Sequence, residues 1–181
     1  MPQPPHRRRP ARGRGFTLIE LLVTLAVLGA LLMVAVPSFN NAVLGNKLAA
    51  FSNSFVAGVQ LARSEAIKRN AAVKICRSSD GATCAGSGGW QQGWIIFNDK
   101  DDDGVIDSDE TRIHYQQALA TDYSFTGDNY AVVLLPTGLA AAAANLTLCR
   151  FSPVGSQERV VSLSTTGRTS VATTKTGSCS A

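Results

Sequence analysis

Twelve residues in the middle of the chain, 99–110, carry oxygen ligands at the spacing of a calcium-binding loop. The segment DKDDDGVIDSDE fits the pattern D-x-D-x-D-G-x-x-D-x-x-E at every position, and Gly104 supplies its sharp turn. The pattern assigns side-chain oxygens to Asp99, Asp101 and Asp103, a backbone carbonyl to Val105, a direct or water-mediated contact to Asp107 and two oxygens to Glu110. Strands are expected on both sides, so this is no EF-hand domain. The sequence leaves two interpretations, a weak calcium site or a solvated acidic hairpin loop.

The four cysteines and two histidines offer little for enzyme chemistry. Cys76, Cys84, Cys149 and Cys179 all follow a long apolar run, and an even number in an exported domain favours disulfides. Three pairings are possible, of which we expect Cys76–Cys84, closing a short loop, and Cys149–Cys179, tying the C-terminal tail to a strand. No CxxC occurs, so zinc is a weak alternative. With only His6 and His114 present, the sequence predicts a protein that is not an enzyme.

An apolar run from residue 16 to 36 is long enough to cross a membrane. Its 21 residues contain a single charged side chain, Glu20, and a bilayer core needs about 20 apolar helical residues. Five arginines and no acidic residue precede it (Arg7, Arg8, Arg9, Arg12, Arg14), which keeps the N-terminus in the cytoplasm. A carboxylate at membrane depth is costly and suggests a functional role for Glu20. A signal peptide would have a shorter apolar region and a small-residue cleavage site.

The basic character of the chain belongs to its first 15 residues. They hold five of the 17 Lys and Arg and none of the 13 Asp and Glu. The remainder therefore has 12 basic and 13 acidic residues, a net charge of −1. Nucleic-acid binding would need a local basic patch, because the overall charge does not favour it.

The hydrophobic period changes once along the chain. Apolar residues recur at three- and four-residue steps after Pro37, at Leu44, Leu48, Phe51, Phe55, Val59, Ala62 and Ala66, which predicts one helix over about 17–69. Pro37 should loosen it locally. From residue 71 the period is two, and it predicts strands at 73–76, 94–97, 112–115, 122–126, 130–135, 146–151, 158–164 and 169–173.

The stretch GFTLIELLVTL, with Pro37 further along the helix, resembles type IV pilins and the pseudopilins of type II secretion. Downstream, GWQQGWIIFNDKDDDGVIDSDE, LLPTG, LTLCR and VVSLSTTGRTS resemble the pseudopilin H/FimT group. The resemblance implies an α+β fold, a long N-terminal helix packed on antiparallel β-sheets. The resulting division is a leader (1–15), a membrane-spanning and filament-core helix (16–37), an amphipathic continuation (38–70) and a β-rich domain (71–181).

The resemblance also implies how the chain is processed and assembled. A prepilin peptidase would cleave between Gly15 and Phe16, and Phe16 would be N-methylated. Glu20 would pair with the new amino terminus of Phe16 on its own or a neighbouring subunit, because two buried opposite charges are tolerable only together. Glu20 then sets the assembly register.

Residues 165–170 are a second candidate site, for contact with duplex DNA. Members of the FimT branch that bind DNA carry a Gly-Arg-x-Arg motif here; Gly167 and Arg168 match it, but Ser170 replaces the second arginine. Arg150, Arg159 and Lys175 would complete a basic patch around Arg168 if their strands are neighbours. The alternative is a β-turn with a solvated arginine.

The sequence thus predicts a minor pilin or pseudopilin. We expect a single-pass inner-membrane protein with a periplasmic or extracellular C-terminal domain, built into a filament with other pilins. A subunit of a type IV pilus, active in pilus assembly, twitching or DNA uptake, is the first assignment. A type II secretion pseudopilin H and a DNA-binding receptor pilin are the alternatives.

Overall fold

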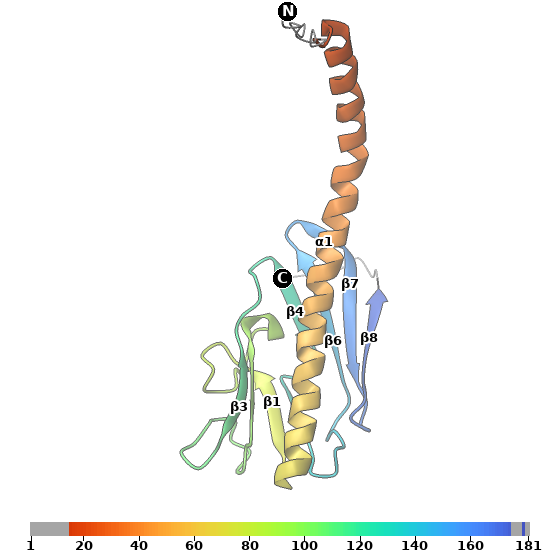
Figure 1. Cartoon of the computed structure of the whole chain (residues 1–181). Helices are drawn as coiled ribbons and strands as arrows, with labels where there is room; N and C mark the ends of the chain where they lie inside the picture. The colour runs from red at the N-terminus through yellow and green to blue at the C-terminus, as the bar shows by residue number, and fades with distance from the viewer. Residues whose placement is uncertain (1–14, 175–178, 180–181) are drawn as a thin grey trace, which may run out of the picture. The chain divides into compact units, whose positions relative to one another are not determined.

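One long helix and eight strands form the part of the chain that the structure, a computed structural model, describes, namely residues 15–174 and Cys179 (Figure 1). In chain order the elements are α1 (Leu18–Arg69), β1 (Val73–Arg77), the short 3-10 helix η1 (Trp90–Gln92), β2 (Trp94–Phe97), β3 (Arg112–Gln116), β4 (Tyr123–Gly127), β5 (Ala131–Leu134), β6 (Ala144–Phe151), β7 (Val154–Leu163) and β8 (Thr169–Thr174). The chain divides into two compact units with the boundary between Asn40 and Asn41. The predicted α+β architecture is confirmed.

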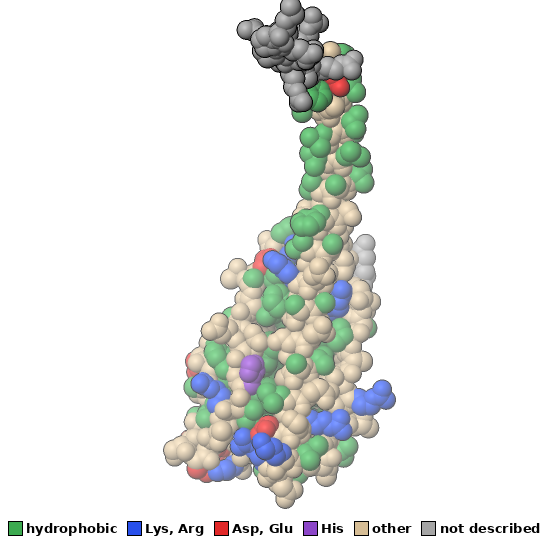
Figure 2. Space-filling view, in the orientation of Figure 1, with side chains coloured by type: hydrophobic (Ala, Val, Ile, Leu, Met, Phe, Trp, Pro, Cys, Tyr) green, Lys and Arg blue, Asp and Glu red, His purple; other side chains and the backbone are tan. Residues whose placement is uncertain are grey.

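The first unit contains the N-terminal part of α1, residues 18–40, which is apolar on all sides. Its large side chains are exposed, among them Leu31 at 63% and Met33 at 81%, and Figure 2 shows hydrophobic side chains along its visible face. The helix is long and apolar enough to cross a membrane. Pro37 lies within α1 and does not end it.

In the second unit, Asn41–Ala181, the rest of α1 is amphipathic. The residues that face the core recur every three or four positions: Leu44, Leu48, Ser52, Phe55, Val59, Ala62 and Ala66. Ser52 is the polar member of this stripe, and its hydroxyl donates to the carbonyl oxygen of Leu48 at 2.8 Å, so its burial leaves no donor unsatisfied. Phe51, predicted for the stripe, is only partly buried and packs at its edge on Tyr123, with ring centroids 5.1 Å apart.

The strands form two antiparallel sheets of four strands each. The order is β3-β2-β1-β5 in one sheet and β4-β6-β7-β8 in the other. All eight predicted strands are present, although β6 and β7 begin earlier than the sequence pattern indicates. These two strands form a hairpin, and Phe151 pairs with Val154 at its tip. Both sheets contribute to one core with the helix.

Phe55 is the side chain at which the helix and both sheets meet. Its ring makes edge contacts with Trp90 of η1, Trp94 of β2 and Phe125 of β4, at centroid distances of 5.1, 5.5 and 5.4 Å. All four residues are at most 1% exposed. Each such aromatic pair adds about 1 kcal/mol beyond the area that it buries, so this cluster fixes the sheets on the second half of α1.

Candidate functional site

The start of α1 holds the residues predicted for processing and assembly. Thr17 precedes the helix and Glu20 is its third residue, the spacing of a capping box. The backbone N–H of Glu20 donates to Thr17 Oγ1 at 3.3 Å, a local role for Thr17 that the sequence reasoning missed. Phe16 is 84% exposed. No cation among the described residues lies within ion-pair distance of the Glu20 carboxylate.

The acidic loop, residues 99–110, joins β2 to β3 and brings its first three predicted ligands together. Carboxylate oxygens of Asp99, Asp101 and Asp103 all lie within 4.8 Å of one another. Asp99 is buried, whereas Asp101 and Asp103 are exposed. Gly104 has the positive φ, 79°, that the sharp turn of such a loop requires.

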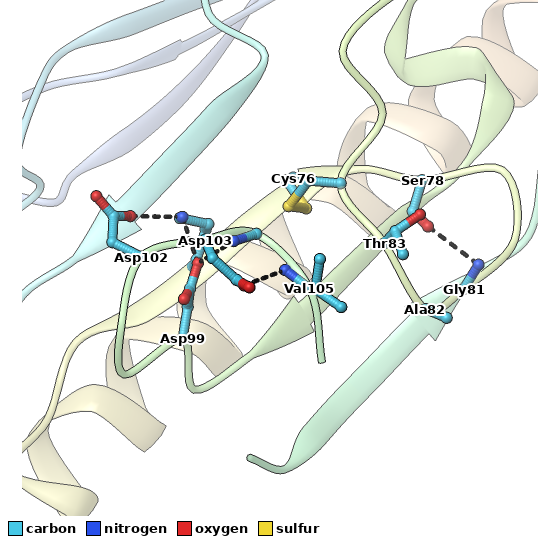
Figure 3. The surroundings of a disulfide bond; sticks show 12 residues. Cys76, Ser78, Gly81, Ala82, Thr83, Asp99, Asp102, Asp103 and Val105 are labelled. Carbon is cyan, nitrogen blue, oxygen red and sulfur yellow. Dashed lines mark hydrogen bonds and ion pairs between the residues drawn. A yellow bond between two sulfur atoms is a disulfide. The ribbon is translucent and has the colours of Figure 1, made fainter. Parts of the chain in front are cut away.

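A lysine that the sequence reasoning missed reaches this loop from β1. Lys74 Nζ contacts Asp99 Oδ2 and lies 2.5 Å from Asp102 Oδ1 (Figure 3). Burial disfavours the charged form of Lys74, but hydrogen bonds to Asp102 and Asp99 outweigh it and raise the pKa of the ammonium. The available signal was a charged residue within an otherwise buried strand, Val73–Arg77, because such a charge requires a partner.

The acidic loop is also joined to the loop closed by the first disulfide (Figure 3). Cys76 and Cys84 are bonded with their Cα atoms 5.5 Å apart. The backbone N–H of Cys84 donates to the Gly104 carbonyl at 2.8 Å, and that of Ile106 donates to the Ala82 carbonyl at 3.2 Å. These two bonds pair the disulfide loop with the middle of the acidic loop.

The second disulfide links Cys149 to Cys179, with Cα atoms 5.8 Å apart. Cys149 lies on β6, so the bond ties the C-terminal region to the second sheet. Both pairs that the sequence analysis favoured are therefore present in the structure.

Asp80, inside the first disulfide loop, organises the turn around it. Its Oδ1 accepts the backbone N–H groups of Ala82 and Thr83 at 2.8 and 2.9 Å, and its Oδ2 accepts the Thr83 hydroxyl at 2.8 Å. These hydrogen bonds favour the charged form and hold the pKa of the carboxyl well below its usual range. The arrangement is structural: its partners all lie within the disulfide loop, and it fixes the shape of that loop.

The predicted basic patch around Arg168 does not form as expected. Arg168 lies in the turn between β7 and β8, which begins after Leu163. Arg150 donates to the carbonyl of Pro153 at 2.9 Å in the hairpin at the other end of β7. Ten strand residues separate these ends, about 30 Å at 3.3 Å per residue, so the two arginines share no patch. Arg159 lies between them and bonds to the neighbouring Gln157 side chain, and Lys175 is outside the described residues.

The cationic neighbour of the Arg168 turn is instead Arg63 of α1. Its Nη1 lies 3.5 Å from the carbonyl oxygen of Gly167. Gly167 itself has φ 74°, and a Cβ there would come within 2.4 Å of the Gly138 carbonyl oxygen, so only glycine fits. The sequence pattern could not show that the helix brings Arg63 to this turn, 104 residues away in the chain.

Family models match both parts of the chain. The model described as "Type II transport protein GspH" covers residues 52–167, and the prokaryotic N-terminal methylation motif covers residues 11–36. The second match includes Gly15, Phe16 and Glu20.

Known proteins resemble the chain over most of its length. The "Pilin-like protein PilA1" of Thermus thermophilus is 32% identical over 165 residues, which is 86% of this chain and 96% of the relative. The type IV minor pilin FimU of Pseudomonas aeruginosa shares the fold with a TM-score of 0.51 and 19% identity, over 69% of this chain and 92% of that one. The minor pseudopilin EpsH of Vibrio cholerae does so with a TM-score of 0.51 and 12% identity, over 69% and 95%. The chain therefore belongs to the GspH family of pilin-like proteins, whose members are structural subunits and not enzymes.

Proposed function

We propose that this minor pilin or pseudopilin is a subunit of a type IV pilus. It is inserted in the inner membrane as a single-pass prepilin, cleaved between Gly15 and Phe16, and built into the filament through residues 16–37. The β-rich domain then lies on the periplasmic or extracellular side and contacts other pilins.

The exposed apolar surface of residues 18–40 carries this proposal. None of its large side chains, from Leu18 at 76% exposed to Phe39 at 69%, is covered within the described structure. Twenty-three helical residues extend about 35 Å, enough to cross a bilayer core of about 30 Å. Such a surface is stable in lipid or against neighbouring helices of the same kind, and both environments occur during pilus assembly.

Glu20 gives the helix its register in the filament. Cleavage after Gly15 would create an amino group on Phe16, four residues before Glu20 and thus one helical turn away. In a filament core a lone carboxylate is strongly unfavourable, and an ammonium partner from the same or an adjacent subunit removes most of that penalty. The pair therefore favours one axial position of each subunit over its alternatives.

Substitution of Glu20 tests the assembly step. Glu20→Gln keeps the size of the side chain but removes its charge. We expect more than a tenfold loss of subunit from sheared filaments, with normal cleavage seen as the processed band on a gel. Gly15→Ala serves as the processing control and should leave the unprocessed band. Normal incorporation of Glu20→Gln would contradict the role of Glu20.

A deletion strain separates the pilus from the secretion machine. The sequence relative PilA1 is named as pilin-like, which favours the pilus. The structural comparison does not discriminate, because the pilus protein FimU and the secretion-system protein EpsH match the chain with the same TM-score. Loss of surface pili with normal export of secreted enzymes is the expected result. Loss of enzyme export with normal pili would assign the chain to type II secretion as a pseudopilin H.

One observation favours duplex DNA as a second, additional ligand. Arg168 lines a cleft of about 460 Å³ together with hydroxyl and amide side chains: Asn145, Ser162, Ser164, Thr166, Thr169 and Ser170. These groups are typical partners of phosphate oxygens. A gel shift of the processed chain in detergent should weaken as salt rises and as Arg168 is changed to Ala. Absence of binding at low salt would leave the subunit a structural one.

A further inference from the structure

The carboxylates of the acidic loop fall into two groups according to their ion pairs. Lys74 pairs with Asp99 and Asp102, and Lys100 pairs with Asp109 at 2.8 Å. The other four acidic residues of the loop are Asp101, Asp103, Asp107 and Glu110, and no ion pair reaches them within the described chain. The protein's own lysines thus compensate Asp102 and Asp109, which no calcium pattern uses, and leave four of the five acidic ligand positions without an ion pair. The two oxygens of Glu110 accept the backbone N–H groups of Lys100 and Asp107.

Asp99 is the exception in the paired group, because it is also a predicted ligand and its second oxygen is buried without a partner. Its side chain is 2% exposed. Oδ2 contacts Lys74 and accepts the backbone N–H of Gly104 at 3.2 Å, but Oδ1 is buried without any hydrogen-bond partner. A buried carboxylate oxygen that binds nothing costs free energy. Asp99 belongs to the group whose oxygens converge with those of Asp101 and Asp103, so a cation bound there would satisfy it.

The backbone leaves a carbonyl oxygen available at the next ligand position. Val105 and Thr83 face each other in an antiparallel bridge, but the hydrogen bonds run between their neighbours, from Cys84 to Gly104 and from Ile106 to Ala82. The N–H and C=O groups of Val105 therefore point away from the disulfide loop. The N–H donates to Asp103 Oδ1 at 2.7 Å, which places the carbonyl of Val105 on the side of the carboxylates.

We propose that the acidic loop binds one calcium ion through Asp99, Asp101, Asp103, the carbonyl of Val105, Asp107 and Glu110. Calcium–oxygen distances are about 2.4 Å, so two ligands on opposite sides of the ion are about 4.8 Å apart. The oxygens of Asp99, Asp101 and Asp103 lie within 4.8 Å of one another and so fit on one such shell. The disulfide Cys76–Cys84 and the pairing of Gly104 with Cys84 hold the middle of the loop in place.

Calcium is favoured over magnesium by the number and irregularity of the ligands. Six protein groups from one loop suit an ion that takes six to eight oxygens, whereas magnesium requires near-ideal octahedral geometry and retains several waters. Lys74 lowers the affinity by its positive charge. A dissociation constant of about 10⁻⁴–10⁻³ M, as in extracellular modules, is expected.

Calorimetric titration of the processed chain, residues 16–181, in nonionic detergent tests the site. After removal of metals by a chelator, calcium chloride or magnesium chloride is added at constant ionic strength. We expect one calcium ion per chain, at least tenfold weaker magnesium binding, and a rise in Tm of about 5 °C at 10 mM calcium.

Two substitutions with the same change of charge distinguish a site from diffuse attraction. Asp103→Asn removes a ligand charge, while an amide oxygen still accepts the Val105 N–H; it should weaken calcium binding at least tenfold. Asp109→Asn, at a side chain 71% exposed and outside the ligand set, should change it less than threefold. Asp101→Asn replaces Asp103→Asn if the latter does not fold by circular dichroism. No saturable binding at 10 mM calcium, equal binding of magnesium, or equal losses in the ligand and control variants would overturn the proposal.

Discussion

The two halves of α1 are both helical, but they differ in which side chains they expose and in what must cover them. Residues 18–40 expose apolar side chains on every side, whereas the half that follows Asn41 buries one stripe and leaves its polar residues outside. The first pattern suits a helix whose whole surface is covered by lipid or other helices, and the second a helix that covers a domain core. In one continuous helix, the apolar surface of the first half must therefore be covered by lipid or other subunits, whereas the apolar stripe of the second half is covered by the strands of its own chain.

The strongest test of this comparison uses one large apolar residue from each half. Phe55→Ala removes the ring that contacts Trp90, Trp94 and Phe125. We expect a loss of about 4 kcal/mol in the free energy of unfolding of the domain, measured by denaturant unfolding in detergent with tryptophan fluorescence.

Leu28→Ala is the matched control in the other half. Leu28 is 51% exposed and lies in the first unit, so its truncation should leave the unfolding of the domain unchanged within about 0.5 kcal/mol. Equal losses for the two variants would show that the halves are not independent in the way the burial pattern indicates.

The disulfides sharpen the comparison, because both crosslinks belong to the second unit. Cys76–Cys84 spans 8 residues and Cys149–Cys179 spans 30. In the chain-entropy model, removing them by Cys→Ala pairs costs about 2.5 and 3.5 kcal/mol respectively. Thermal unfolding should show the larger loss for the second pair, while the helicity of residues 18–40 in detergent stays constant. The reverse order would mean that the contacts of the first loop with the acidic loop, and not loop length, dominate.

Much of this fold follows from the sequence because period and polarity identify each element. The apolar run, the stripe from Leu44 to Ala66 and all eight strands follow from spacing, and the family resemblance implied a long helix packed on antiparallel sheets. The division into two sheets and the strand orders come only from the structure. The spacing of residues could not show which strand ends lie close to one another in the fold. The basic patch was expected only if the strands of Arg150 and Arg168 are neighbours. Arg168 lies in the turn between β7 and β8, whereas Arg150 lies beside the β6–β7 hairpin at the opposite end of β7.

The candidate site shows the same limit. The ligand positions of the acidic loop are local and could be read from twelve consecutive residues. Lys74 and Arg63 reach their partners across 25 and 104 positions of the chain, distances that only the folded structure resolves. Lys74 had a signal, as a charge in a buried strand; Arg63, on the face of an amphipathic helix where charges are common, had none.

The smallest expected effect concerns pH, which should act on the domain and not on the apolar half of the helix. The hydrogen bonds of Asp80 depress its pKa in the folded state, so their stabilisation is fully present above the unfolded pKa of about 3.9 and is lost progressively as the pH falls from there through the lower folded-state pKa. Asp80→Asn should lower the Tm of the domain at pH 7 by about 3 °C, a contribution of about 1 kcal/mol after solvent screening.

The difference between the Asp80→Asn variant and the wild type should shrink at pH 3, since the unfolded wild-type chain then takes up a proton at Asp80, whereas the folded chain, in which the pKa of this carboxyl is depressed, stays ionised. Asp128→Asn provides the control, because its exposed carboxylate accepts no hydrogen bond from the described residues. That variant should change the Tm by less than about 1 °C at either pH. A constant difference for Asp80→Asn between pH 7 and pH 3 would mean that the shape of the turn, and not the charge of Asp80, holds the disulfide loop.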